Sequence, residues 1–132
     1  MDWKLELIVV PTADVERSKT FYNEQLGFGV DHDTRISDDV RLVQLTPPGS
    51  GCSIAIGMSE MEPGSLKGLQ LVVPDINAAR DQLVERGVEV SPVQHHDGTG
   101  MVDGPGGRWN SFLFFSDPDG NSWSVQESPA DE

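Results

Sequence analysis

Cysteine is nearly absent from this 132-residue sequence, and long apolar runs are missing altogether. The single Cys52 cannot form a disulfide within the chain, and no pair of cysteines is present to hold a metal ion. No stretch of 18 apolar residues occurs, which excludes a membrane-spanning helix. Residues 1–4 also lack the basic start of a signal peptide. We therefore expect a cytoplasmic protein, because reducing compartments keep thiols free.

Positive charge is scarce as well. Nine Lys and Arg residues stand against 22 Asp and Glu residues, which gives a formal net charge of −13. Such a surface repels phosphate groups, so we expect neither nucleic acid nor an anionic membrane as a partner. The excess charge is explained by solubility in a crowded or saline cytosol, or by attraction of a cationic ligand to an acidic cleft. The scattered acidic residues leave both explanations open.

What the sequence does contain is an internal repeat with an offset of 61 residues. Apolar runs at residues 5–11 and 69–74 both end in Val-Val-Pro and lead into an aspartate, Asp14 in the first copy and Asp75 in the second. An aspartate in this place is typical of a helix N-cap, and a glycine follows each predicted helix where it ends. The apolar residues of each helix recur at i, i+3 and i+7, so each helix has one face that must pack on a sheet.

Several short β-like segments follow each predicted helix. They cover residues 29–33, 40–46 and 52–57 in the first copy, and 88–94, 110–116 and 122–127 in the second. The pattern predicts an α+β fold of two βαβββ modules in a single domain over residues 1–132. Module 1 covers about residues 1–58, a linker covers about 59–67, and module 2 covers about 68–128.

Two motifs of the chain resemble a known family. Residues 14–22, Asp-Val-Glu-Arg-Ser-Lys-Thr-Phe-Tyr, with Leu-Gly-Phe at 26–28 are similar to the first-helix signature of the vicinal oxygen chelate superfamily, which includes glyoxalases and bleomycin resistance proteins. Residues 114–121, Phe-Phe-Ser-Asp-Pro-Asp-Gly-Asn, resemble that family's last hairpin. The two motifs occur in this order, one in each copy of the repeat. Together with the repeat, the resemblance covers essentially the whole chain.

The resemblance implies two βαβββ modules whose sheets curl around a cavity, in a homodimer. Enzymes of the family hold a divalent metal there with His, Gln or Glu side chains on the first and last strands of each half. The metal polarises two oxygen atoms of the substrate. Members include lyases, isomerases, dioxygenases and metal-free drug-binding proteins.

The ligand positions implied by the resemblance carry side chains that do not suit a metal. Counting from the motifs places them at Leu7, Ala55, Leu69 and Ser124. Leucine and alanine cannot ligate a metal through their side chains, and a lone serine hydroxyl is a poor ligand. We therefore expect these four residues to line a ligand cavity instead. A one-residue slip would offer Glu6 and Gln70 as metal ligands, but it would turn each side chain to the opposite face of its strand.

Other candidates lie in the second half. Trp109 could stack on a ligand, and Gln126 shares the strand face of Ser124. His95 and His96 are interpreted as loop residues, with His96 as a possible general base beside the alternative candidate Glu6. The glycine-rich segment 97–107 is interpreted as a mobile flap over the cavity.

Together these observations predict a protein that binds a small organic molecule, of the sequestration or resistance type, without a cofactor. The alternative is a glyoxalase-like lyase, isomerase or dioxygenase with a divalent metal at a non-standard site.

Overall fold

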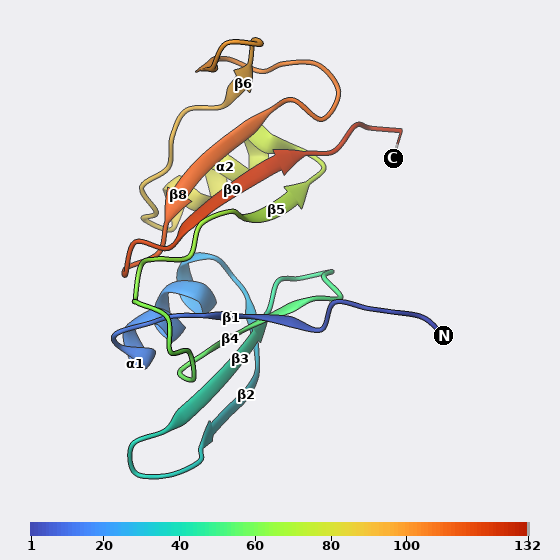
Figure 1. The fold of residues 1–132 in the computed structure, drawn as a ribbon. Helices are drawn as coiled ribbons and strands as arrows, with labels where there is room; N and C mark the ends of the chain where they lie inside the picture. Colours follow the sequence, from blue (N-terminus) through green and yellow to red (C-terminus); the bar gives the residue numbers. More distant parts are fainter. Residues whose placement is uncertain (132) are drawn as a thin grey trace. The chain divides into compact units, whose positions relative to one another are not determined.

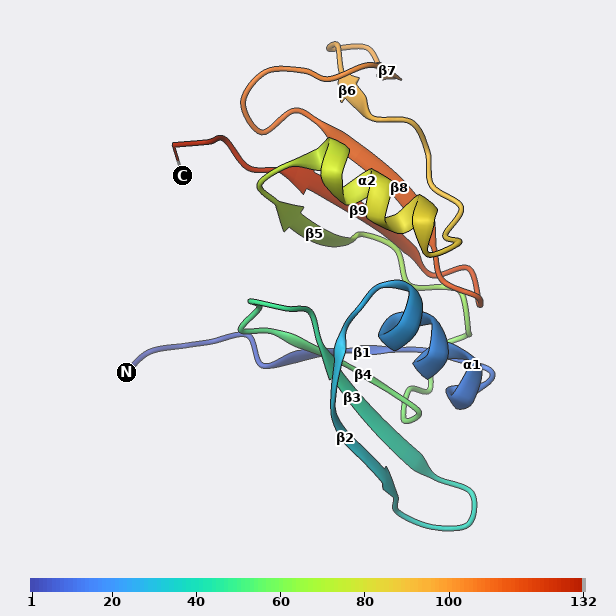
Figure 2. The same cartoon turned by 180° about the vertical axis from the view of Figure 1, so that it is seen from behind.

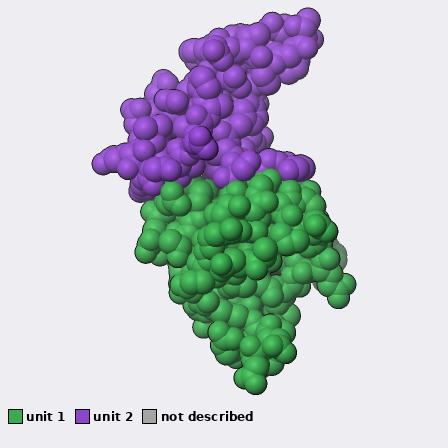
Figure 3. Space-filling model, turned by 90° about the vertical axis from the view of Figure 1, so that its left-hand side faces the viewer, with its two compact units in different colours: residues 1–66, 117–121 green, residues 67–116, 122–132 purple. Residues whose placement is uncertain are grey.

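The computed structural model describes residues 1–131 and shows an α+β fold with two mixed sheets (Figures 1 and 2). The chain forms two compact units, coloured separately in Figure 3. The first contains residues 1–66 together with 117–121, and the second contains residues 67–116 together with the chain from Ser122 onward. Among the described residues, no helix combines the length and the apolar character needed to cross a membrane.

The first unit is built on a four-stranded sheet. Its elements are β1 (Leu7–Val10), α1 (Val15–Thr20), a π-helical turn η1 (Phe21–Gln25), β2 (Gly29–Arg35), β3 (Arg41–Thr46) and β4 (Ser53–Ile56). The strand order is β1-β4-β3-β2, in which β1 pairs with β4 in parallel and the other pairs are antiparallel. The first predicted βαβββ module is confirmed.

The second unit contains a five-stranded sheet. Its elements are β5 (Leu69–Val73), α2 (Ile76–Glu85), β6 (Gln94–His96), β7 (Met101–Asp103), β8 (Phe112–Ser116) and β9 (Ser122–Glu127). The strand order is β5-β9-β8-β6-β7, with β5 and β9 parallel. Figure 2 shows α2 lying along one face of this sheet.

Both predicted helix starts are confirmed. A side-chain oxygen of Asp14 accepts a hydrogen bond from the Arg17 backbone at 3.1 Å, and Asp75 does the same for Ala78 at 3.1 Å. Each bond satisfies one of the N–H groups that the first turn of a helix leaves without an intrahelical partner. The repeat seen in the sequence is therefore a repeat of local hydrogen bonding.

The end of the first helix differs from the regular helix that the sequence predicts. From Phe21 the backbone widens into a π-helical turn, and Leu26 N donates to Phe21 O at 3.0 Å. The wider turn buries both Phe21 and Tyr22, whose rings pack edge to face with centroids 5.2 Å apart. Adjacent residues of a regular helix point about 100° apart, so the local widening serves to bury two consecutive aromatic rings.

One expectation for the second module was wrong. The strand expected at residues 88–94 begins instead at Gln94, because Pro92 has no N–H to donate to a neighbouring strand. The segment 97–107, interpreted from the sequence as a mobile flap, contains β7, which pairs with β6. Asp97 orders the turn between them: hydrogen bonds from the Thr99 hydroxyl and from the backbone of Thr99 and Gly100 lower the pKa of its carboxyl to about 2.

The Asp-Pro-Asp-Gly-Asn turn between β8 and β9 belongs to the first unit. Asp117 accepts the buried Tyr22 hydroxyl at 2.6 Å. Asp119 accepts bonds from the Thr12 hydroxyl at 2.8 Å and from Arg17 at 2.9 Å. The turn therefore holds both the start of α1 and the buried Tyr22 of the π-helical turn.

Candidate functional site

The second sheet has one buried face and one open face. Along β5, β8 and β9 the side chains alternate, and the strand register places Leu69 beside Trp123 and Gln70 beside Ser124. Leu69 and Trp123 are buried, whereas Gln70 is exposed and Ser124 half-buried. Successive residues of a strand point to opposite faces, so this register determines which residues lie on the buried face and which lie on the open face. The open-face residues of these three strands are Gln70, Val72, Phe112, Phe114, Ser116, Ser122, Ser124 and Gln126.

A chain of hydrogen bonds crosses this open face. The Ser124 hydroxyl donates to Gln70 Oε1 at 2.8 Å, and Gln70 Nε2 donates to Gln126 Oε1 at 3.0 Å. Gln126 Nε2 then donates to the backbone oxygen of Trp109 at 2.7 Å. Each amide uses one donor and one acceptor within the chain, so the orientation of every side chain follows from that of its neighbour.

The last acceptor of this chain belongs to a residue in an unusual backbone conformation. Trp109 has φ of 60°, a left-handed value that costs energy for a residue with a large side chain. Its indole is 41% exposed. The loop that carries it is fixed by Gly106 N, which donates to Ser111 Oγ at 3.0 Å, and by the Asn110 side chain, which bonds both backbone groups of His96 at 2.9 Å. The fold therefore holds a strained tryptophan in a position where solvent reaches it.

Two phenylalanines add an aromatic surface to the same face. Phe112 and Phe114 lie two residues apart on β8, with ring centroids 6.4 Å apart and planes 13° from parallel. Phe114 remains 36% exposed. Exposed aromatic rings beside ordered amides are typical of surfaces that bind small organic molecules, because the rings supply contact area and the amides supply orientation.

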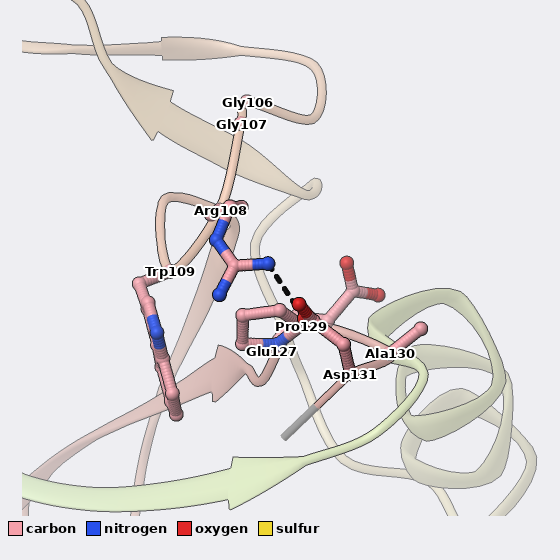
Figure 4. Close-up of a pocket in the computed structure, with 8 residues that line it drawn as sticks. All are labelled: Gly106, Gly107, Arg108, Trp109, Glu127, Pro129, Ala130 and Asp131. Carbon is pink, nitrogen blue, oxygen red and sulfur yellow. Dashed lines mark hydrogen bonds and ion pairs between the residues drawn. The ribbon is translucent and has the colours of Figure 1, made fainter.

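A pocket of about 340 Å³ lies beside Trp109, within the second unit. Arg108 points toward Asp131, and the two side chains form an ion pair of 2.5 Å (Figure 4). Glu127 accepts a hydrogen bond from the Ile76 backbone at the start of α2, at 2.9 Å. The eight lining residues are Gly106, Gly107, Arg108, Trp109, Glu127, Pro129, Ala130 and Asp131.

Two of the four positions expected to line the cavity lie on opposite faces of the second sheet. Leu7 and Ala55 lie on the first sheet, where Ala55 pairs with Val9, so that both point to the face opposite the fully buried Val10. In the second unit, Ser124 lies on the open face, but Leu69 lies on the buried face, only 6% exposed. The structure therefore brings Ser124 together with Gln126 and Trp109 but places Leu69 behind them.

The alternative candidates belong to both units. Glu6 is an exposed residue just before β1 in the first unit, while Gln70 lies on the open face of the second sheet. His95 and His96 lie on strand β6 rather than in a loop. His96 Nδ1 accepts a hydrogen bond from Gly98 N at 3.0 Å, so the imidazole ring stabilises the turn between β6 and β7. The two candidate bases therefore lie in different units.

The residues of this face do not fit a divalent metal. Its polar side chains are neutral amides and hydroxyls, and Gln70, Gln126 and Ser124 already bond one another. The face offers none of the carboxylate or imidazole side chains that usually supply most ligands of a divalent metal. Within residues 1–131, no three His, Cys, Asp or Glu side chains gather closely enough to hold a metal ion. No chemical step through a metal follows from this set of residues.

Comparison with known proteins places the chain in a family. The model of the Glyoxalase/Bleomycin resistance protein/Dioxygenase superfamily matches residues 4–125. TnmS3, an antibiotic binding protein from Streptomyces sp. CB03234, is 34% identical with a TM-score of 0.76, over 96% of this chain and 97% of its own. No match was found among curated proteins.

Two further solved structures give the same result. A glyoxalase/bleomycin resistance protein from Streptomyces sp. CB03234 is 35% identical with a TM-score of 0.72, over 93% of this chain and 99% of its own. A member of the same superfamily from Sphaerobacter thermophilus DSM 20745 is 28% identical with a TM-score of 0.77, over 96% of this chain and 98% of its own.

Proposed function

The chain belongs to the glyoxalase/bleomycin resistance protein/dioxygenase superfamily, and on this basis we propose that it binds a small aromatic organic molecule without converting it. The ligand lies against Trp109 and the open face of the second sheet. The observation that carries this proposal is the hydrogen-bond chain through Gln70 and Gln126, because it orders neutral polar groups beside exposed aromatic rings.

The similarity to TnmS3 supports this choice of function. That protein is an antibiotic binding protein, and the two sequences are 34% identical over nearly their full lengths. Binding alone is sufficient for a sequestration role, since a protein that holds a toxic molecule lowers its free concentration. We propose that the ligand is a natural product with a fused or extended aromatic ring system, because stacking on an indole selects flat rings.

Removal of the Trp109 side chain tests this proposal. We expect acridine, a neutral three-ring aromatic, to bind the protein and to raise its melting temperature. Trp109→Ala should weaken acridine binding roughly tenfold, since the loss of one aromatic contact at a binding site costs about 1–2 kcal/mol. Isothermal titration calorimetry gives the two dissociation constants.

The matched control is Trp3→Ala, which removes an indole that is almost fully exposed near the start of the chain. Its affinity for acridine should equal that of the unchanged protein. If acridine does not bind at all, or if both variants bind it as well as the parent, Trp109 is not part of a binding site for aromatic molecules.

The proposed binding needs no metal. We expect the melting temperature and the affinity for acridine to stay unchanged after dialysis against EDTA and after addition of Mn²⁺, Zn²⁺ or Mg²⁺. A bound metal would stabilise the folded state by mass action and raise the melting temperature. Metal content can be measured by inductively coupled plasma mass spectrometry on protein purified without chelator. One metal ion per chain would contradict this expectation.

A further inference from the structure

The pocket beside Trp109 selects for charge as well as for aromatic rings. We infer that the ligand carries a cationic group, and that Arg108 occupies the place of that group in the ligand-free protein. This inference rests on the proposed function, since it concerns the same ligand. It starts from the pocket of about 340 Å³, which lies within the size range of small-molecule sites.

Arg108 is one of the residues that line this pocket. Its guanidinium forms an ion pair with Asp131, while the indole of the next residue, Trp109, lines the same pocket (Figure 4). A cation beside a carboxylate and an indole is held by charge attraction and by the negative face of the ring. A protonated amine of a ligand would meet the same two groups. The pocket therefore already contains the chemistry that recognises a cation.

The Arg108–Asp131 pair can be broken at small cost. Their side chains are 59% and 69% exposed, and exposed ion pairs contribute little to stability. The freed guanidinium can move into water on its flexible stem, where it is well solvated. Exchange of Arg108 for a ligand cation therefore leaves no buried charge without a partner.

The surrounding charge favours a cation over an anion. Two of the eight lining residues, Glu127 and Asp131, are acidic and one is basic. The chain as a whole carries −13, a field that attracts cations and slows the approach of anions. An anionic ligand would instead have to displace Asp131 from Arg108 against this field. The two possibilities predict opposite effects for the same substitutions, which makes them separable.

Three acridines of equal ring system and different charge test the inference. At pH 7, 9-aminoacridine is a cation, acridine is neutral and acridine-9-carboxylate is an anion. We expect 9-aminoacridine to bind about fivefold more tightly than acridine, and the carboxylate to bind more weakly than both. Raising NaCl from about 0.05 to 0.5 M should remove most of this preference and leave acridine binding unchanged, because salt screens exposed charges.

Two substitutions test how the charges of Arg108 and Asp131 affect binding. Arg108→Gln removes the competing cation and should strengthen 9-aminoacridine binding about threefold, whereas Asp131→Asn should abolish the preference for 9-aminoacridine over acridine. The controls make the same charge changes elsewhere: Arg35→Gln in the first unit, and Asp81→Asn on the exposed side of α2. Neither control should alter the ratio of the two affinities.

The outcomes separate this inference from the proposed function. If acridine and 9-aminoacridine bind equally, the proposed function stands and the inference is wrong. If the carboxylate binds best, is weakened by Arg108→Gln and strengthened by Asp131→Asn, the site recognises an anion and the inference is overturned. If none of the three compounds binds, the proposed function fails and the inference fails with it.

Discussion

Replacing Asp119 with alanine is expected to lower the free energy of unfolding by about 3 kcal/mol, the largest effect of any exchange at a polar residue discussed above. The carboxylate of Asp119 is only 2% exposed. It accepts hydrogen bonds from the Thr12 hydroxyl at 2.8 Å, the Ala13 backbone at 3.1 Å and the Ser18 hydroxyl at 3.2 Å. Alanine removes the acceptor of all three bonds and of the ion pair with Arg17, and bonds to a charged acceptor contribute more than bonds between neutral groups.

Urea-induced unfolding followed by circular dichroism measures this loss. The control is Asp81→Ala, at an exposed position on α2, which should change the free energy of unfolding by no more than about 0.5 kcal/mol. Equal stability of the two variants would show that the turn does not anchor the first unit.

The same residue predicts how stability depends on pH. Burial acts to raise the pKa of the Asp119 carboxyl, but the hydrogen bonds from Thr12, Ala13 and Ser18 and the charge of Arg17 outweigh it and hold the pKa below its ordinary value. A lowered pKa in the folded state means that the stabilisation is complete above about pH 4 and is lost as the pH falls through the folded-state pKa. Asp119→Asn should therefore lose less stability than the parent between pH 4 and pH 2.

The second large effect is expected at Gly106, in the loop that carries Trp109. A Cβ atom at this position would lie 2.3 Å from the backbone oxygen of Asn110 and 2.7 Å from the Cβ of His95. Gly106→Ala therefore forces the loop to move, and overpacking of this kind costs about 1–3 kcal/mol. Because Trp109 lies in the displaced loop, we expect acridine binding to weaken about tenfold or more.

Gly107 provides the matched control. It lines the same pocket and has the same side chain, but a Cβ atom there meets nothing within 4 Å. Gly107→Ala should bind acridine within about twofold of the parent, since surface exchanges away from special features change energies by no more than about 0.5 kcal/mol. Calorimetric titration measures the acridine affinity of both variants, and their melting temperatures show whether they are folded. Equal affinities would mean that the loop adapts and that its shape does not define the site.

The architecture could be predicted from the sequence because the repeated features depend on interactions between residues close together in the chain. The aspartate N-caps at Asp14 and Asp75 and the alternating strands depend on neighbours within a few residues, and both were confirmed. The π-helical turn was not predicted, because its widening follows from the burial of Phe21 and Tyr22 together, which is a tertiary effect. The strand expected at residues 88–94 overlooked that Pro92 cannot donate to a ladder.

The candidate site was predicted in part. Trp109, Ser124 and Gln126 do come together, since Gln126 bonds to Trp109 and shares a face with Ser124. Leu69 lies on the face opposite Ser124, because the strand register places its neighbour Gln70 beside Ser124. The repeat does not fix this register, because the Val-Val-Pro runs are offset by 63 residues and the helix caps by 61. The role of Arg108 could not be predicted, because its partner Asp131 lies 23 residues away in an irregular segment.

The Asp117–Asn121 turn links the two copies of the repeat, because it lies in the second copy and belongs to the first unit. A chain cut after residue 66 would retain every strand of the first sheet. It would nevertheless lack the carboxylate that accepts the Tyr22 hydroxyl and the Asn121 amide that donates to Pro11 O at 2.8 Å and accepts from Leu66 N at 3.1 Å. The first copy thus completes its packing with five residues that the second copy encodes. Duplication has therefore left the two copies unequal, because the first compact unit is assembled from both halves of the sequence.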